Sequence, residues 1–165
     1  MELPEQTKTR ALRILERRDV SRRELIEKLT AKGESPEAAE AVADWLVDLG
    51  VVDDVRYAAM VVRHYAAKGY GKSRIRNELF RHGLPKDLWE EAMLQYPEQD
   101  ETIDRLLRSK LRSSAPDRAE LKRATDALLR RGFSWSEIQS AKQRVLADQD
   151  NEEFYGMTEG INFED

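Results

Sequence analysis

Three glycines, Gly33, Gly83 and Gly132, stand at matching places in a pattern that recurs about every 50 residues. Each has a leucine four residues before it, and a residue suited to a helix start two residues after it. The aligned residues are Leu25, Ile75 and Ala124; Leu29, Leu79 and Leu128; and Ser35, Pro85 and Ser134. Since glycine commonly ends a helix and serine or proline commonly opens one, the pattern predicts a helix-turn-helix pair in three copies.

Apolar residues spaced three or four apart predict one further helix before each pair, which makes nine helices in all. The clearest apolar stripe runs through residues 38–49, and no segment shows the alternation expected of a strand. Several helix starts carry their own signals. Ser21 with Glu24, and Ser134 with Glu137, have the spacing of a capping box, while Asp53 can cap the helix that follows it.

The sequence therefore predicts an all-α protein built from three tandem three-helix repeats. The expected repeats span 8–52, 53–97 and 98–147, and an acidic tail that we expect to be disordered spans 148–165. Each repeat buries too little apolar surface to be stable alone, so we expect the three to stack into an elongated, curved body. Tryptophans at positions 45, 89 and 135 fall in the third helix of each repeat, where core packing is the simplest role for them.

The formal net charge of −4 hides an uneven distribution. Residues 148–165 contain seven acids and no base, so residues 1–147 carry a net charge of +3. The densest basic stretch, residues 63–86, contains seven bases and one acid. Such an excess of one sign repels itself within the fold and favours an anionic partner.

Residues 68–83, called the basic segment below, combine this charge with a predicted turn. Gly69 and Gly71 flank Tyr70 and predict a tight turn between two helices, because glycine readily takes left-handed backbone angles. In the second of these helices Ile75 and Leu79 share an apolar face, and the bases lie on strips beside it. The segment is thus a candidate contact surface in which the two glycines only shape the turn.

No catalytic, metal-binding or cofactor-binding pattern stands out. There is no cysteine, so disulfides, thiolate nucleophiles and cysteine metal sites are excluded. The only histidines, His64 and His82, lack metal-ligand spacing, and Asp53 with Asp54 fits a helix start better than a magnesium site. We expect no enzyme activity, no metal and no cofactor. Without a signal peptide or a membrane-spanning run, the chain is expected to be a soluble cytoplasmic protein.

Three stretches resemble the bacterial RecX regulatory proteins. They are Ala11-Leu-Arg-Ile-Leu-Glu-Arg-Arg-Asp-Val-Ser-Arg-Arg-Glu-Leu25, Gly50-Val-Val-Asp-Asp-Val-Arg-Tyr-Ala58 and Lys68-Gly-Tyr-Gly-Lys-Ser-Arg-Ile-Arg-Asn-Glu-Leu79. The similarity covers residues 8–147 and is strongest in the first two repeats, while the acidic tail is outside the pattern. It implies three three-helix repeats in a curved body.

The resemblance further implies a non-enzymatic regulator that binds the RecA recombinase and its filament on single-stranded DNA. Such regulators act in DNA repair and the SOS response, and they limit filament growth, ATP hydrolysis and strand exchange, although some stimulate recombination instead. Separately, we expect the protein to be a monomer. The residues that we expect to contact the partner are Lys68, Tyr70, Lys72, Arg74 and Arg76, with Arg81 secondary.

Two alternatives remain open from the sequence. One is a helix-turn-helix module that binds DNA directly through the helix from Lys72 to His82, with affinity that falls steeply as salt rises. The other is a helical scaffold for an unrelated partner. The tail could also fold back on the basic segment and weaken binding to DNA, although a purely solubilising tail is the simpler interpretation.

Overall fold

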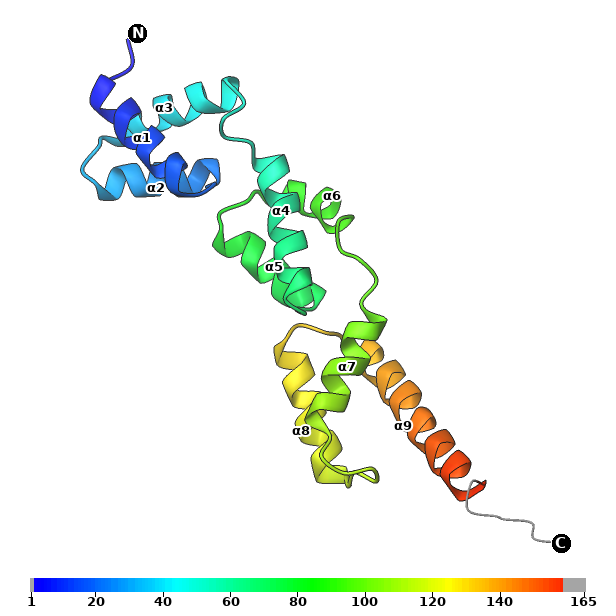
Figure 1. Cartoon of the computed structure of the whole chain (residues 1–165). Coiled ribbons are helices and arrows are strands. Elements are labelled where there is room, and N and C mark those ends of the chain that lie inside the picture. Colours follow the sequence, from blue (N-terminus) through cyan, green and yellow to red (C-terminus); the bar gives the residue numbers. More distant parts are fainter. Residues whose placement is uncertain (1, 159–165) are drawn as a thin grey trace, which may run out of the picture. The chain divides into compact units, whose positions relative to one another are not determined.

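The structure is a computed structural model that describes residues 2–158, with side chains as far as residue 148 (Figure 1). The described chain folds into helices and turns, without a strand in that range. It divides into two compact units: one contains α1 to α4, most of α5, η1 and α6, and the other contains Gly69–Arg74 and α7 to α9. The predicted all-α fold is confirmed.

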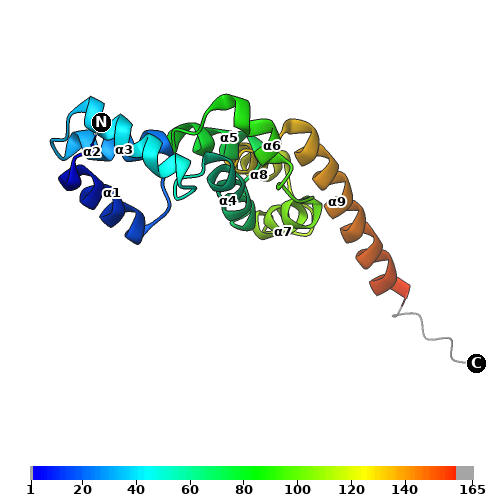
Figure 2. The ribbon, with the colours of Figure 1, turned by 90° about the horizontal axis from the view of Figure 1, so that it is seen from above.

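The first unit holds two repeats. Its elements are α1 (Glu5–Arg17), α2 (Arg22–Ala31), α3 (Pro36–Asp48), α4 (Asp54–Ala67), α5 (Lys72–Arg81), the 3-10 turn η1 (Lys86–Leu88) and α6 (Trp89–Met93). Figure 2 shows α1, α2 and α3 grouped at the N-terminal end of this unit. Ala11, Leu25, Leu29, Val42 and Leu46 are fully buried there and form the core of the first repeat.

The predicted caps set the helix starts. The Oγ of Ser21 accepts a hydrogen bond from the amide of Glu24, whose carboxylate accepts one from the amide of Ser21 in return. The Oγ of Ser35 accepts from the amide of Ala38, and Oδ1 of Asp53 accepts from the amide of Arg56. These bonds satisfy amides that have no partner within their own helix.

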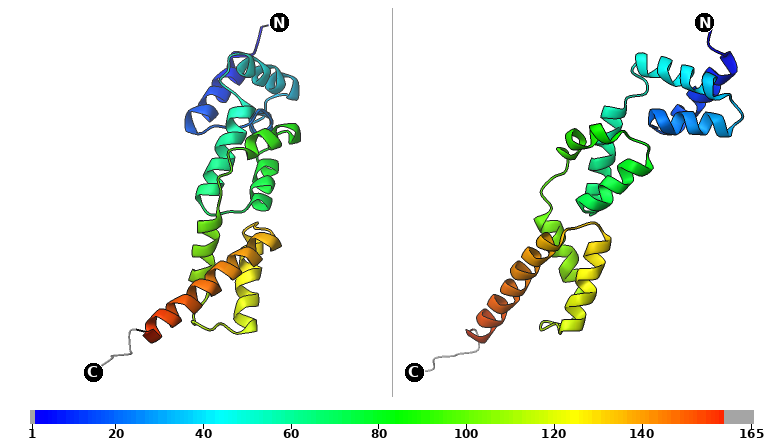
Figure 3. Two further views of the ribbon diagram at one scale, coloured as in Figure 1. Left: turned by 90° about the vertical axis from the view of Figure 1, so that its right-hand side faces the viewer. Right: turned by 180° about the vertical axis from the view of Figure 1, so that it is seen from behind.

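The second unit contains α7 (Asp100–Lys110), α8 (Arg118–Arg130) and α9 (Trp135–Thr158). Figure 3 shows α7, α8 and α9 together in both of its views. Ile103, Leu107, Leu128 and Ile138 are buried between the three helices. The guanidinium of Arg144 on α9 donates to both carboxylate oxygens of Asp104 on α7 at 2.8 to 3.1 Å, which fixes these two helices side by side.

The repeat register is confirmed by backbone angles and burial. Gly33, Gly83 and Gly132 all have positive φ, at +96°, +68° and +97°. The leucine four residues before each glycine is fully buried. The same turn therefore closes the second helix of all three repeats.

Some local expectations were wrong. Trp135 is 61% exposed at the start of α9, because Phe133 and Ile138 already fill the core beside it. The helix predicted to follow Pro85 is divided into η1 and the short α6.

The last helix runs into the acidic segment, whose expected disorder stays a prediction. Helix α9 continues as far as Thr158, because residues 148–155 contain neither proline nor glycine and each added residue extends the helical hydrogen bonding. Residues 159–165 of the predicted tail lie outside the described residues. Within residues 2–158, none of the helices has the length and apolar character needed to cross a bilayer.

Candidate partner-binding surface

The turn at the start of the basic segment packs against the turn between α8 and α9. The amide of Gly71 donates to the carbonyl oxygen of Arg131 at 2.8 Å, and the amide of Ser73 donates to that of Gly132 at 3.2 Å. In return, Nε of Arg131 donates to the carbonyl oxygen of Gly69 at 3.0 Å. The two turns are thus joined through their backbones.

The two glycines of this turn are needed for different reasons. Gly69 has a φ of +81°, as the sequence predicted. Gly71 does not have a positive φ, so the prediction that it takes left-handed backbone angles is wrong. A Cβ at Gly71 would instead lie 2.3 Å from the carbonyl carbon of Gly132, so the second glycine allows two backbones to approach closely.

Tyr70 belongs to this packed turn. Its ring centroid lies 5.1 Å from the guanidinium carbon of Arg74 and 4.9 Å from that of Arg131, and its side chain is half-buried. Both distances suit cation–π contacts. The structure therefore brings together two of the predicted contact residues, Tyr70 and Arg74, and adds Arg131.

Other predicted contact residues lie on α5, beside its buried apolar face. Ile75 and Leu79 are buried, as the predicted apolar face requires. Arg81 is exposed, and its guanidinium lies 3.3 Å from the carboxylate of Glu78, a side chain only 5% exposed. The charge of Arg81 is thus partly used to balance a buried carboxylate whose burial the sequence pattern did not indicate.

Arg76 lines an open groove with apolar walls. The groove also contains Lys86, Trp89, Met93 and Leu94, together with two acids, Asp87 and Glu90. The indole Nε1 of Trp89 donates to the carbonyl oxygen of Leu84 at 3.0 Å, which fixes the ring. Leu94 is 79% exposed, and an adjacent groove that shares Trp89 and Lys86 is lined by Phe80, which is 67% exposed.

Lys68 completes the predicted set. It caps α4 and is exposed, and its ammonium lies 5.6 Å from the ring centroid of Tyr65. Lys72, the first residue of α5, is also exposed. Of the six predicted residues, Tyr70 and Arg74 pack with Arg131 in the second unit. In the first unit, Arg81 pairs with Glu78 and Arg76 lines the apolar groove.

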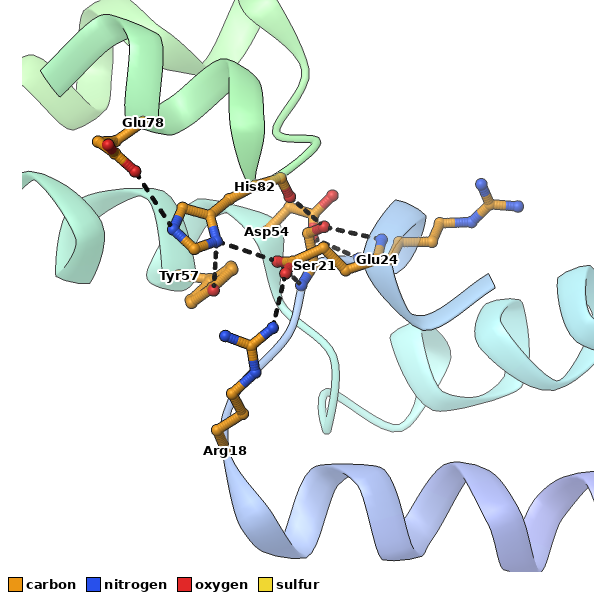
Figure 4. A network of polar contacts seen from close by, with 8 residues as sticks. Arg18, Ser21, Glu24, Asp54, Tyr57, Glu78 and His82 are labelled. Atoms are coloured by element: carbon orange, nitrogen blue, oxygen red, sulfur yellow. Dashed lines mark hydrogen bonds and ion pairs between the residues drawn. The ribbon is translucent and has the colours of Figure 1, made fainter. Parts of the chain in front are cut away.

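Polar side chains connect the first repeat to the second within the first unit (Figure 4). The Nδ1 of His82 lies 3.2 Å from the hydroxyl of Tyr57 and 3.5 Å from Oε1 of Glu24, and Arg18 pairs with the same carboxylate at 3.1 Å. The Oγ of Ser21 donates to the carbonyl oxygen of His82. His82 thus has a structural role in this network.

Burial changes the titration of two groups in this network. Oδ1 of Asp54 accepts from the amide of Arg22 at 3.0 Å, but burial outweighs this bond and raises the pKa of Asp54. Burial also raises the pKa of Tyr57, with the negative charge of Glu24 adding to the effect. Among the residues whose side chains are described, no group of three metal-ligating side chains comes together.

These features define a class: an all-α protein of tandem three-helix repeats whose exposed bases and apolar side chains are arranged on helix surfaces. The family models for the first, second and third three-helix domains of RecX match residues 8–46, 53–93 and 98–141. The chain belongs to the RecX family of regulatory proteins.

Similar proteins agree with this family. The regulatory protein RecX of Xanthomonas campestris pv. campestris (strain B100) is 43% identical over 141 residues, covering 84% of this chain and 87% of the relative. That of Stenotrophomonas maltophilia (strain R551-3) is 41% identical over 134 residues, covering 80% and 82%. The crystal structure of RecX from Lactobacillus salivarius has a TM-score of 0.77 at 23% identity, covering 85% of this chain and 94% of that one. This last likeness supports the fold alone.

Proposed function

We propose that this chain binds the RecA recombinase and its filament on single-stranded DNA, and that it inhibits filament growth, ATP hydrolysis and strand exchange. The observation that carries the proposal is the match to all three RecX domains in order along the chain. The relatives are named regulatory proteins, which supports a role in control instead of catalysis. The same matches fall inside the repeat boundaries that we propose, 8–52, 53–97 and 98–147.

For the recombinase contact we propose the Arg76 groove, defined by Arg76, Trp89, Met93 and Leu94. Protein interfaces gain most of their binding energy from a few residues, among which tryptophan and arginine are enriched. An exposed leucine beside a fixed indole ring and a guanidinium offers both apolar area and charge to a protein partner. This combination suits a protein surface better than a bare phosphate backbone.

The six residues predicted from sequence then divide into two roles. We propose Lys68, Lys72 and Arg76 as contact residues, because all three are exposed. Tyr70 and Arg74 support the turn that carries Lys72 through their packing with Arg131, and Arg81 supports α5 through Glu78.

The test is the ATP hydrolysis rate of the cognate RecA on single-stranded DNA while this protein is titrated in. The wild type should lower the rate at substoichiometric protein. The double variant Arg76→Ala/Leu94→Ala should need about tenfold more protein for the same effect, since truncating two central contacts costs about 1.4 kcal/mol or more in total.

The matched control is Arg123→Ala/Leu129→Ala, which removes the same residue types from exposed positions on α8. It should inhibit like the wild type. If the wild type leaves the hydrolysis rate unchanged, the proposed function is wrong. If both double variants inhibit like the wild type, the function stands but the Arg76 groove is not the contact surface.

A further inference from the structure

A second groove, in the first repeat, is lined almost entirely by cations. It has a volume of about 530 Å³ and lies along α1 and α2. Its lining includes no acid, and its charged members are Arg13, Arg17, Arg18, Lys28 and Lys32. Ile14 and Ala31 supply its apolar lining. We call it the cationic groove; it is separate from the basic segment.

The helix geometry places these cations on two opposing walls. Arg13 and Arg17 are four residues apart on α1, and Lys28 and Lys32 are four apart at the end of α2, so each pair shares one face of its helix. The guanidinium of Arg10 donates to the carbonyl oxygen of Lys32 at 3.1 Å. This bond holds the middle of α1 against the end of α2 and brings the two walls together.

Three acids of α2 and of the turn after it are already paired, one of them with Arg18 of the groove. Glu24 pairs with Arg18 at 3.1 Å, Glu27 pairs with Arg23 at 3.1 Å, and Glu34 pairs with Arg10 at 2.8 Å. Glu16 of α1 does not line the groove. Of the five cations only Arg18 has an ion pair among the side chains described up to residue 148.

The fold alone does not account for this arrangement. Cations in the last turn of a helix are favoured by the helix dipole, which explains Arg17 and Lys28 in part. Arg13 precedes the last turn of α1, and bringing four unpaired cations around one groove raises their mutual repulsion. The repulsion is relieved when an anion occupies the groove.

We propose that the cationic groove binds the phosphate backbone of single-stranded nucleic acid, independently of the recombinase. A row of phosphates carries a regular series of negative charges that can meet cations on both walls at once. The groove offers no exposed aromatic or large apolar side chain, so it lacks the anchors expected for an acidic protein partner.

The test measures binding of a fluorescein-labelled oligothymidylate to the full-length protein by anisotropy over a series of salt concentrations, without recombinase. The groove variant is Arg13→Gln/Arg17→Gln/Lys28→Gln. On a plot of log affinity against log salt concentration the slope is negative, and each lost phosphate contact makes it shallower by about 0.7. The triple variant should therefore have a slope shallower by about 2, and it should bind at least about tenfold more weakly at low salt.

The matched control, Arg118→Gln/Arg123→Gln/Arg130→Gln on α8, removes the same net charge from exposed positions. It should bind the oligonucleotide nearly like the wild type. Arg13→Lys/Arg17→Lys keeps the charge and should keep most of the affinity. Circular dichroism and thermal unfolding of every variant establish that the fold is retained.

Three outcomes would overturn the proposal: no binding by the wild type at low salt, equal losses in both triple variants, or poly-L-glutamate displacing the oligonucleotide at equal charge concentration. The last result would point to an acidic protein surface instead. Because recombinase is absent from this experiment, its result is independent of the ATP hydrolysis test of the proposed function.

Discussion

The amide of Gly71 donates a hydrogen bond of 2.8 Å to the carbonyl oxygen of Arg131, sixty residues further along the chain. Beside this bond, the α-carbon of Gly71 approaches the backbone of Gly132 so closely that no side chain fits between them. The turn that opens the basic segment therefore depends on the turn that ends α8. A change in either turn should affect the other.

Gly71→Ala should destabilise the protein by about 1–3 kcal/mol, because its Cβ would overlap a backbone carbonyl that cannot rotate away as a side chain can. Urea unfolding followed by circular dichroism measures the loss. The control is Arg76→Ala in α5, which follows this turn; the position is exposed, and the change should be within about 0.5 kcal/mol. Equal stability of Gly71→Ala and wild type would mean that this close approach does not exist in solution.

Tyr70→Ala should lower the unfolding free energy by about 1–2 kcal/mol, because it removes a half-buried ring together with its contacts to two guanidinium groups. Tyr70→Phe keeps the ring and its negative face, so its stability should stay within about 0.5 kcal/mol of the wild type. Thermal unfolding compares the two. If Tyr70→Phe lost as much as Tyr70→Ala, the hydroxyl group and not the ring would be the important part.

Arg81→Gln should lower the unfolding free energy by about 1 kcal/mol, because it removes one of the cationic groups beside the buried carboxylate of Glu78. The exposure of Arg81 limits the loss, since solvent screens the pair. Glu78→Gln/Arg81→Gln should be more stable than the sum of the two single changes indicates. Strict additivity in this double-mutant cycle would show that the ion pair contributes nothing to the unfolding free energy. Arg81 would then again be proposed as a contact residue.

The helices, their caps and the repeat register could be predicted from sequence because they depend on residues a few positions apart. Ser21 with Glu24 is one example, since both partners lie within a single helical turn. The contact of Gly71 with Arg131 could not be predicted in this way, because no local pattern links residues from different repeats.

The candidate surfaces show the same limit. Local charge identified the basic segment, but it gave no sign that Glu78 is buried beneath Arg81. The cationic groove was missed because its two walls come from different helices. Four-residue spacing of bases, as in Arg13 with Arg17 and Lys28 with Lys32, was the available signal. It becomes informative once α1 and α2 are known to pack together.

Asp54→Asn tests the effect of burial on a carboxyl group at the junction of the first two repeats. Burial raises the pKa of Asp54 above its ordinary value of 3.8, so the folded state keeps its proton to higher pH than the unfolded state does. Stability from this group is therefore fully present below about pH 3.8 and is lost as the pH rises through the folded pKa. The asparagine stays neutral and retains an oxygen that can accept from the amide of Arg22.

The unfolding free energy of Asp54→Asn relative to wild type should accordingly increase from about pH 3 to about pH 6 in a series of urea titrations. Glu120→Gln should show the opposite pH dependence of the unfolding free energy. The Glu120 carboxylate accepts hydrogen bonds from the amides of Arg112 and Ser113 and from the hydroxyl of Ser113, and these bonds lower its pKa. The unfolding free energy of Glu120→Gln should therefore fall below that of the wild type as the pH rises. Parallel pH profiles for the two variants would contradict the opposite environments that the structure gives these carboxylates.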